Sequence, residues 1–131
     1  MKKIKSALVS VSDKSNLKPL LKILKKNKVK IISSGGTFKA IKRLKFDCFE
    51  VSDFTGFKEI LGGRVKTLHP KIHAGILSKR NNKLHQKQLK SNKFENIDLV
   101  IVNFYPFEKT LEKTKKHEKI LENIDIGGPA M

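Results

Sequence analysis

The sequence is poor in the residues that build cross-linked or metal-clustered proteins. Cys48 is the only cysteine among 131 residues, so a disulfide framework and a zinc cluster are both excluded. No apolar run approaches the ~18 residues that a membrane-spanning helix needs. The apolar stretch behind the basic residues 1–5 is also too short for a secretory signal peptide. We therefore expect a cytoplasmic protein without a bound metal ion.

Acidic residues are also scarce, with 12 aspartates and glutamates against 29 lysines and arginines, for a formal charge of +17. A basic domain of this kind can bind nucleic acid by displacing counterions from the phosphate backbone. However, 26 of the 29 cations are lysines spread along the whole chain, whereas proteins that read nucleic acid favour arginine. We interpret most of the charge as a solvated surface and expect no nucleic-acid partner.

What the sequence does contain is a regular alternation of strand and helix patterns, in a length typical of one domain. Short β-branched runs predict strands at 5–11, 29–33, 47–52 and 96–103. Helices are predicted around Leu17 to Leu24 and at 38–44, 71–77, 81–93 and 111–123. This alternation predicts an α/β fold, a three-layer sandwich whose mostly parallel sheet is covered by helices on both faces.

The second predicted strand runs straight into Ser34-Gly35-Gly36-Thr37, and a helix follows. Glycine lets backbone N–H groups converge, the hydroxyls add donors, and a helix start carries partial positive charge, so this turn could hold a phosphate. The same residues could instead form a tight strand-to-helix turn in which a serine or threonine caps the helix. Both interpretations stay open on these residues alone.

The densest group of polar residues follows Gly62-Gly63, where the glycines allow a sharp turn. Arg64, Lys66 and Thr67 come directly afterwards, and Pro70 can open a helix just beyond them. Few purely structural segments need so many polar groups within so few residues. The stretch therefore predicts a site for an anionic small molecule.

Further polar residues follow the predicted strands at the edge where open parallel sheets bind their ligands. Ser12, Ser34 and Asn103 each stand at a strand end, and Tyr105 comes two residues after Asn103. Tyr105 could equally pack as an amphipathic side chain with its hydroxyl bonded inside the protein. Asp125 is an acidic residue just before Gly127-Gly128, which predict a second glycine turn.

Four segments, in this order and spacing, together resemble one known family. They read VSVSDK at 9–14, SGGT at 34–37, GRVKTLHP at 63–70 with HAGIL at 73–77, and NFYPF at 103–107 with IDIGGP at 124–129. Their order and wording are similar to the N-terminal IMP cyclohydrolase domain of the bifunctional purine biosynthesis enzyme, whose other half is an AICAR formyltransferase. The resemblance covers nearly all 131 residues.

The resemblance implies a methylglyoxal-synthase-like fold and one reaction of purine biosynthesis. 5-Formamido-1-(5-phosphoribosyl)imidazole-4-carboxamide, FAICAR, loses water to give IMP when its carboxamide nitrogen attacks the formyl carbon. No metal or organic cofactor is implied for this half, since 10-formyltetrahydrofolate is used only by the formyltransferase half. The small-molecule nucleotide is the implied partner, and the full-length enzyme is expected to be a homodimer.

The resemblance also implies roles for individual residues. Lys66 would stabilise negative charge on the formyl oxygen, while Tyr105 and Asp125 would move protons. His69 is expected to shape the loop. The implied nucleotide-binding residues are Ser12, Asp13, Lys14, Ser34, Gly35, Gly36, Thr37, Arg64, Val65, Lys66, Thr67, Val102, Asn103, Asp125, Ile126, Gly127 and Gly128.

The sequence departs from the family pattern after the second glycine turn. In the family, that turn continues into a helix with an essential lysine, whereas this sequence stops at Met131, and the formyltransferase half is absent. We therefore expect a truncated domain that binds nucleotide weakly and turns over poorly or not at all.

Two other functions remain open on the sequence. A methylglyoxal-synthase-like lyase acting on small phosphosugars shares the implied fold and a Gly-Thr phosphate loop, but it lacks a stretch like the one at 64–70. A non-catalytic basic module that binds nucleotides or nucleic acid would account for the charge of +17 without any chemistry.

Overall fold

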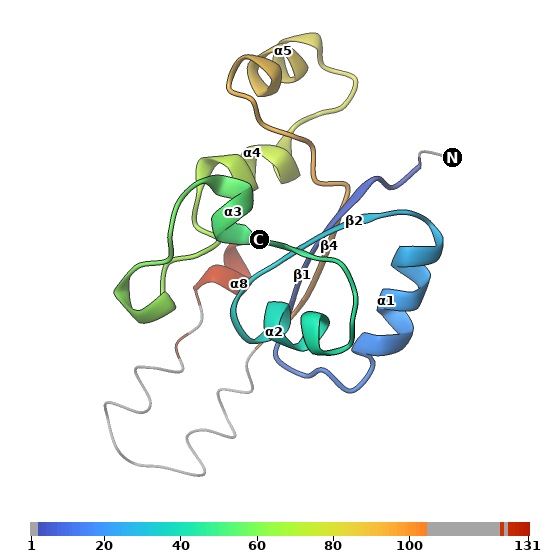
Figure 1. Ribbon diagram of the computed structural model, residues 1–131. Coiled ribbons are helices and arrows are strands. Elements are labelled where there is room, and N and C mark those ends of the chain that lie inside the picture. The colour runs from blue at the N-terminus through green and yellow to red at the C-terminus, as the bar shows by residue number, and fades with distance from the viewer. Residues whose placement is uncertain (1–2, 105–123, 125) are drawn as a thin grey trace.

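The computed structural model describes residues 3–104, 124 and 126–131, and a sheet of four strands lies at its centre (Figure 1). The strands, all parallel to their neighbours, are β1 (Ser6–Val11), β2 (Lys30–Ser33), β3 (Phe49–Glu50) and β4 (Leu99–Asn103). Their order across the sheet is β3-β2-β1-β4. Parallel pairing brings the carboxyl ends of all four strands to one edge, where the sequence places its polar residues.

Helices alternate with these strands, as the sequence predicts. They are α1 (Leu17–Lys26), α2 (Gly35–Arg43), α3 (Val51–Thr55), the 3-10 turn η1 (Leu61–Gly63), α4 (Pro70–Leu77), α5 (Lys83–Ser91) and α8 (Gly127–Ala130). Helix α5 stands away from the sheet at the tip of an excursion between α4 and β4 (Figure 1). Within the described ranges no helix is both long and apolar enough to cross a membrane. The predicted helix at 111–123 lies outside the described residues.

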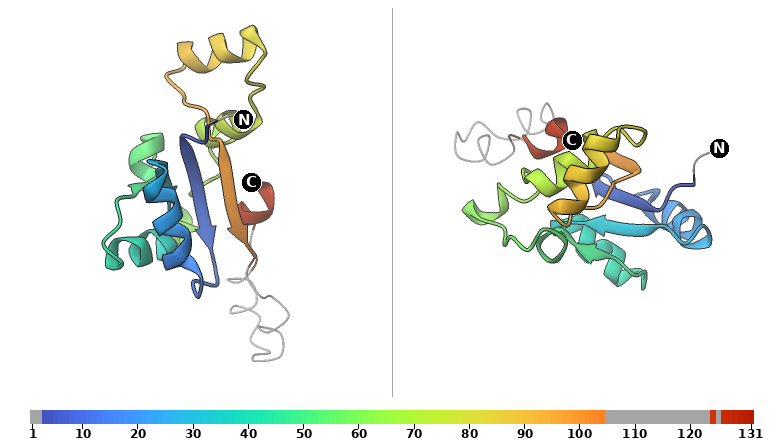
Figure 2. Two further views of the ribbon diagram at one scale, coloured as in Figure 1. Left: turned by 90° about the vertical axis from the view of Figure 1, so that its right-hand side faces the viewer. Right: turned by 90° about the horizontal axis from the view of Figure 1, so that it is seen from above.

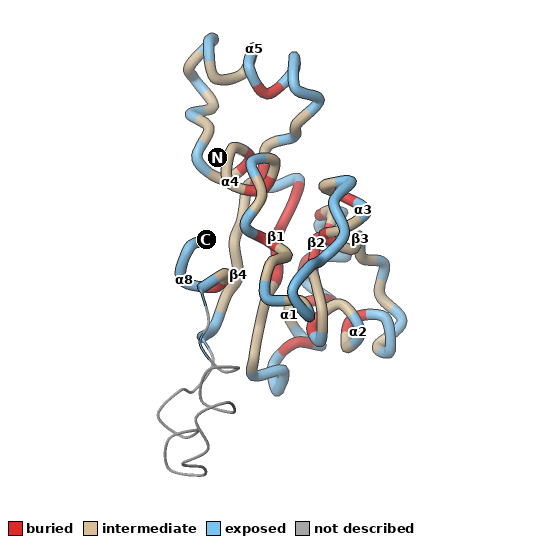
Figure 3. Tube along the Cα trace, turned by 90° about the vertical axis from the view of Figure 1, so that its left-hand side faces the viewer, coloured by how far each residue is buried: buried red, intermediate tan, exposed pale blue. Residues whose placement is uncertain are grey.

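The core has two halves, one on each face of the sheet (Figure 2). Ala7 and Val9 of β1 pack against α1 and α2, whereas Leu8 between them packs against α3 and α4. Ile31 and Ile32 of β2 divide in the same way, and all five side chains are at most 4% exposed. The buried segments run along β1 and β2 in Figure 3. Burial of alternate side chains on opposite faces confirms the predicted three-layer α/β sandwich.

The third predicted strand, 47–52, is wrong at both ends, because β3 contains only Phe49 and Glu50. Strand β3 ends at Glu50, and Val51 begins helix α3. Val51 and Phe54 are 1% and 6% exposed, and both belong to the core that contains Leu8. Side chains three residues apart share one face of a helix but lie on opposite faces of a strand. Burial of both residues therefore outweighs the preference of valine for strands.

The fourth predicted strand, 96–103, begins only at Leu99. The N–H group of Ile97 donates to the Gly75 carbonyl of α4 at 2.9 Å and so serves a helix instead of the sheet. Gly75 permits this close approach, because a Cβ built on it would lie 2.7 Å from the carbonyl oxygen of Glu95. The start of β4 is thus set by the packing of α4, which the local pattern of 96–103 does not reveal.

Candidate functional site

One amide side chain joins the loop after β1 to the end of β4. Asn103 Oδ1 accepts hydrogen bonds from the N–H groups of Ser12 and Asp13, at 2.5 and 3.2 Å. Its Nδ2 donates to the Asp13 carbonyl at 3.2 Å. The parallel register sets this contact, since Val11 lies opposite Asn103. The structure therefore brings together Ser12, Asp13 and Asn103, which the sequence assigns to one site.

Thr37 ties the start of α2 to the end of β1. Its hydroxyl donates to the Val11 carbonyl at 2.9 Å and accepts from the Val11 N–H at 3.1 Å. The residue is only 4% exposed. The hydroxyl that the sequence offers to a phosphate is thus already bonded inside the protein. A ligand would meet Thr37 through its backbone N–H in the first turn of α2.

We expect Thr37→Val to lower the free energy of unfolding by about 1–3 kcal/mol, because Val11 then loses both bonds at a buried position. Urea denaturation measures this change. Thr37→Ser is the matched control, since serine keeps the hydroxyl and should retain most of the stability. A loss of stability in Thr37→Ser without a loss in Thr37→Val would show that the methyl group, rather than the two bonds, stabilises this junction.

The turn at 34–37 is the tight strand-to-helix connection of one interpretation, but Ser34 at the N-cap position makes no capping hydrogen bond through its side chain. It connects β2 to α2 directly, with Ser34 as the N-cap residue and Gly35 at a φ of +53°. The N–H groups in the first turn of an α-helix have no acceptor within the helix, and they carry partial positive charge. The turn is therefore a tight connection whose geometry also suits an anion.

Two ammonium groups flank this turn. A Cβ built on Gly35 would lie 3.0 Å from Lys66 Nζ, and one built on Gly36 would lie 4.0 Å from Lys14 Nζ. Lys14 comes from the loop after β1, where its Nζ donates to the Ser12 carbonyl at 3.0 Å. Lys66 comes from the segment before α4. Segments far apart in the chain thus gather positive charge at one edge of the sheet, which favours an anionic ligand.

A tight turn presents Lys66. Ile60 and Val65 form an antiparallel bridge, with N–H to carbonyl distances of 3.2 and 3.4 Å. Gly62 and Gly63 lie between them at φ values of +64° and +86°, a region that glycine adopts readily. The Lys66 side chain then runs over Gly63, where a Cβ would lie 2.7 Å from Lys66 Cε. Glycine at 63 is therefore needed both for the turn and for the path of Lys66.

His69 caps the start of helix α4. Its Nδ1 accepts a hydrogen bond from the Lys71 N–H at 3.1 Å, which makes it the N-cap residue. Its ring lies 5.9 Å from that of Phe57, and its own N–H donates to the Thr67 carbonyl at 2.8 Å. These contacts agree with the expectation that His69 shapes the loop.

Glu59 is a residue of this site that the sequence analysis did not select. Its Oε2 lies 3.7 Å from Lys66 Nζ. The two residues flank the Ile60–Val65 bridge, so the chain reversal at Gly62-Gly63 places them side by side. The glycine pair was the available signal, because residues on either side of a tight turn become neighbours across it.

The remaining predicted residues divide into two groups. Among those in the described ranges, Arg64 and Ile126 are exposed, Val65, Val102 and Gly127 are half-buried, and Thr67 and Gly128 are buried. Tyr105 and Asp125, two of the three predicted catalytic residues, lie outside the described residues. Their assignment therefore stays a prediction from the sequence.

The single cysteine is not a nucleophile of this site. Burial raises the pKa of the Cys48 thiol to about 12, with Lys42 opposing this rise and Glu50 adding to it. Because the thiolate is the reactive form, such a thiol is inert near neutral pH. Among the described residues, no group of three or more histidine, cysteine, aspartate or glutamate side chains is placed to hold a metal ion.

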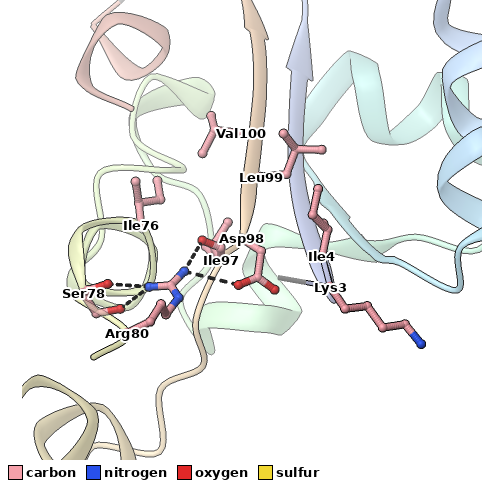
Figure 4. A pocket seen from close by; sticks show the side chains of 9 residues that line it. All are labelled: Lys3, Ile4, Ile76, Ser78, Arg80, Ile97, Asp98, Leu99 and Val100. Atoms are coloured by element: carbon pink, nitrogen blue, oxygen red, sulfur yellow. Dashed lines mark hydrogen bonds and ion pairs between the residues drawn. The ribbon is translucent and has the colours of Figure 1, made fainter. Parts of the chain in front are cut away.

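A hollow of about 360 Å³ lies beside the amino ends of β1 and β4, at the opposite edge of the sheet (Figure 4). The Arg80 guanidinium at its rim donates to the carbonyls of Ser78 and Ile97, both at 2.6 Å, and pairs with Asp98 at 3.5 Å. These contacts hold the segment between α4 and α5 against the start of β4. The residues that line the hollow are other than those predicted for the site, so we place the candidate site at the carboxyl edge.

Proteins named "Bifunctional purine biosynthesis protein PurH" are similar to this chain along nearly its whole length. The protein from Prochlorococcus marinus (strain MIT 9215) is 57% identical over 126 residues, which are 95% of this chain and 24% of the relative. The protein from Persephonella marina (strain DSM 14350 / EX-H1) is 54% identical over 127 residues, 97% of this chain and 25% of the relative. The chain thus spans about a quarter of the length of these curated relatives.

A solved structure and a family match agree with this similarity. The crystal structure of ForH superposes with a TM-score of 0.82 at 30% sequence identity, covering 98% of this chain and 65% of that chain. The MGS-like domain family matches residues 16–130, a range that contains the turn at 34–37, Lys66 and Asn103. Since the match covers most of the chain and the parallel sheet agrees with it, this chain belongs to the MGS-like domain family.

Proposed function

We propose that this chain is the IMP cyclohydrolase domain of a bifunctional purine biosynthesis enzyme. The observation that carries the proposal is its identity of 57% and 54% to two relatives named as purine biosynthesis proteins, over almost all of the chain. The site geometry supports it, because FAICAR brings a phosphate to the edge where N–H groups, hydroxyls and two ammonium groups gather.

The proposed reaction is a dehydrative ring closure. The carboxamide nitrogen of FAICAR attacks its formyl carbon, a carbon–nitrogen bond forms, and the former formyl oxygen leaves as water to give IMP. Negative charge builds on that oxygen during the attack, and a fixed ammonium group beside it lowers the barrier. Lys66 is our candidate for this role. Both reacting groups belong to one molecule, so the enzyme has mainly to orient them.

The phosphate would bind at the start of α2. First-turn N–H groups, the Ser34 and Ser12 hydroxyls and the Lys14 ammonium are suitable donors for a dianion. Arg64 and Thr67 complete the proposed contacts from the segment before α4. Tyr105 and Asp125 would carry the protons that leave the amide and reach the departing hydroxyl.

The proposal needs no metal or organic cofactor for this reaction. AICAR formyltransferase activity, with 10-formyltetrahydrofolate, would belong to the part of the enzyme that this chain does not match. We further propose a cytoplasmic enzyme that is a homodimer in its full-length form and that has no nucleic-acid partner.

Binding of IMP tests the proposal against a basic module that binds nucleic acid. We expect IMP to raise the melting temperature in proportion to the logarithm of its concentration, since a ligand that binds the native state stabilises it by mass action. A DNA oligomer should give a smaller rise that disappears at higher salt, because polyanion binding depends on counterion release. Stabilisation by DNA alone would contradict the proposal. Stabilisation by a small phosphosugar, but not by IMP, would favour the lyase.

A further inference from the structure

The two ammonium groups of the site have different partners. Lys66 Nζ lies 3.7 Å from the carboxylate of Glu59, whereas Lys14 Nζ donates to the backbone carbonyl of Ser12 at 3.0 Å. A carboxylate at this distance cancels much of the field that an ammonium group presents to an approaching anion. A carbonyl orients the ammonium group but leaves its net charge in place. The two lysines therefore offer a ligand different electrostatic environments beside one glycine turn.

The position of the Glu59–Lys66 pair follows from the backbone. A Cβ built on Gly63 would lie 2.9 Å from Lys66 Nζ and 3.5 Å from Glu59 Oε2, so both side chains meet over this glycine. Gly35 lies on the other side, with its own Cβ position 3.0 Å from Lys66 Nζ. The ammonium group thus lies between the turn at 35 and the turn at 63, with the carboxylate beside it.

The proposed substrate has two kinds of oxygen that could face an ammonium group. Its phosphate is already a dianion when it binds, whereas its formyl oxygen is uncharged until the ring begins to close. A carboxylate repels the first and tolerates the second. An ammonium group accelerates a reaction only if its interaction is stronger in the transition state than in the bound substrate. The charge of a phosphate dianion does not change during ring closure. Its interaction with Lys66 would therefore be no stronger in the transition state and would not lower the barrier.

We propose that Glu59 is a specificity-determining residue: its carboxylate excludes a phosphate dianion from the Lys66 ammonium group and reserves that group for an oxygen that is neutral on binding. This inference rests on the proposed function, because it assigns the two ends of FAICAR to the two lysines. The phosphate goes to the side of Lys14, and the formyl group goes to Lys66. Glu59 acts through Lys66 and needs no contact with the substrate.

The test measures inorganic phosphate binding at each lysine, in the unmodified chain and in Glu59→Gln. The ammonium ¹H–¹⁵N NMR signals of Lys66 and Lys14 report the two positions separately. We expect Glu59→Gln to tighten phosphate binding at Lys66 about three- to tenfold at low salt and less at high salt, because both side chains are partly exposed. The Lys14 signal should titrate as it does in the unmodified chain.

Glu95→Gln is the matched control. Glu95 forms an ion pair of 3.0 Å with Lys30, which starts β2 at the opposite edge of the sheet, and its substitution removes the same charge from the protein. If Glu95→Gln tightened phosphate at Lys66 equally, the effect would be one of net charge and the inference would be wrong. Unchanged or weaker phosphate binding in Glu59→Gln would also overturn it.

Titration with IMP, beside the phosphate titrations, separates this inference from the proposed function. Failure of IMP to bind the unmodified chain would refute the cyclohydrolase proposal. Tighter phosphate at Lys66 in Glu59→Gln would still establish that Glu59 excludes anions there. Conversely, IMP binding without any response of Lys66 to Glu59→Gln would keep the proposed function and remove the role of Glu59.

Discussion

Replacing Lys66 by methionine is expected to lower the rate of ring closure about 100- to 1,000-fold, the usual effect of removing a group that stabilises a developing oxyanion. Methionine keeps most of the length of the side chain and removes its charge. The affinity for IMP should change by less than about tenfold, because a group that acts mainly in the transition state contributes little to binding the ground state. The variant should therefore lose kcat far more than affinity.

The measurement combines two assays on the same variants of the full-length enzyme, of which this chain matches about a quarter. Formation of IMP from FAICAR gives kcat and KM, and calorimetric titration with IMP gives the affinity. Lys87→Met is a suitable control, since Lys87 is an exposed lysine of α5, the helix that stands away from the sheet. If the Lys66 variant kept its rate and lost only affinity, Lys66 would be a binding residue, and its assignment to the formyl oxygen would be wrong.

Replacing Ile72 by alanine is expected to destabilise the protein by about 2–5 kcal/mol, since a large buried side chain is removed and a cavity remains. Ile72 is 0% exposed and packs in the core that contains Leu8, Ile32 and Phe54. This loss is a large part of the total stability of a small domain, about 5–15 kcal/mol. Helix α4 follows directly on the segment that presents Lys66, so partial unfolding of α4 should also weaken IMP binding.

Leu77→Ala on the same helix is the matched control. Leu77 is 73% exposed, and its truncation should change the free energy of unfolding by no more than about 0.5 kcal/mol. Urea denaturation of both variants measures the difference, because the slope with urea should be shared and the midpoint should move only for Ile72→Ala. Similar losses in the two variants would contradict the assignment of Ile72 to the core beneath the sheet.

The sequence predicts which loops carry cations, hydroxyls and the amide of Asn103, because these signals are local. Each of these groups stands near a glycine or at a strand end, and both features can be recognised within a few residues. The groups are the turn at 34–37, the cations at 64 and 66, and the asparagine at 103. The partners of these groups are not local. The Thr37 hydroxyl is hydrogen-bonded to Val11, and the Asn103 side-chain amide is hydrogen-bonded to the loop after β1. A sequence pattern contains no information on which donors are already occupied by such distant contacts.

The amino-acid sequence alone predicts the alternation of strands and helices, the parallel sheet with two buried faces, and the loops that carry cations and hydroxyls. All of these follow from periodicity and residue type over short windows. The folded structure was needed to show that Val51 belongs to a helix, that β4 begins at Leu99, and that Glu59 pairs with Lys66. The physical reason is that burial, close helix approach and charge pairing depend on which residues meet after folding, and local propensity yields wherever those contacts contribute more free energy.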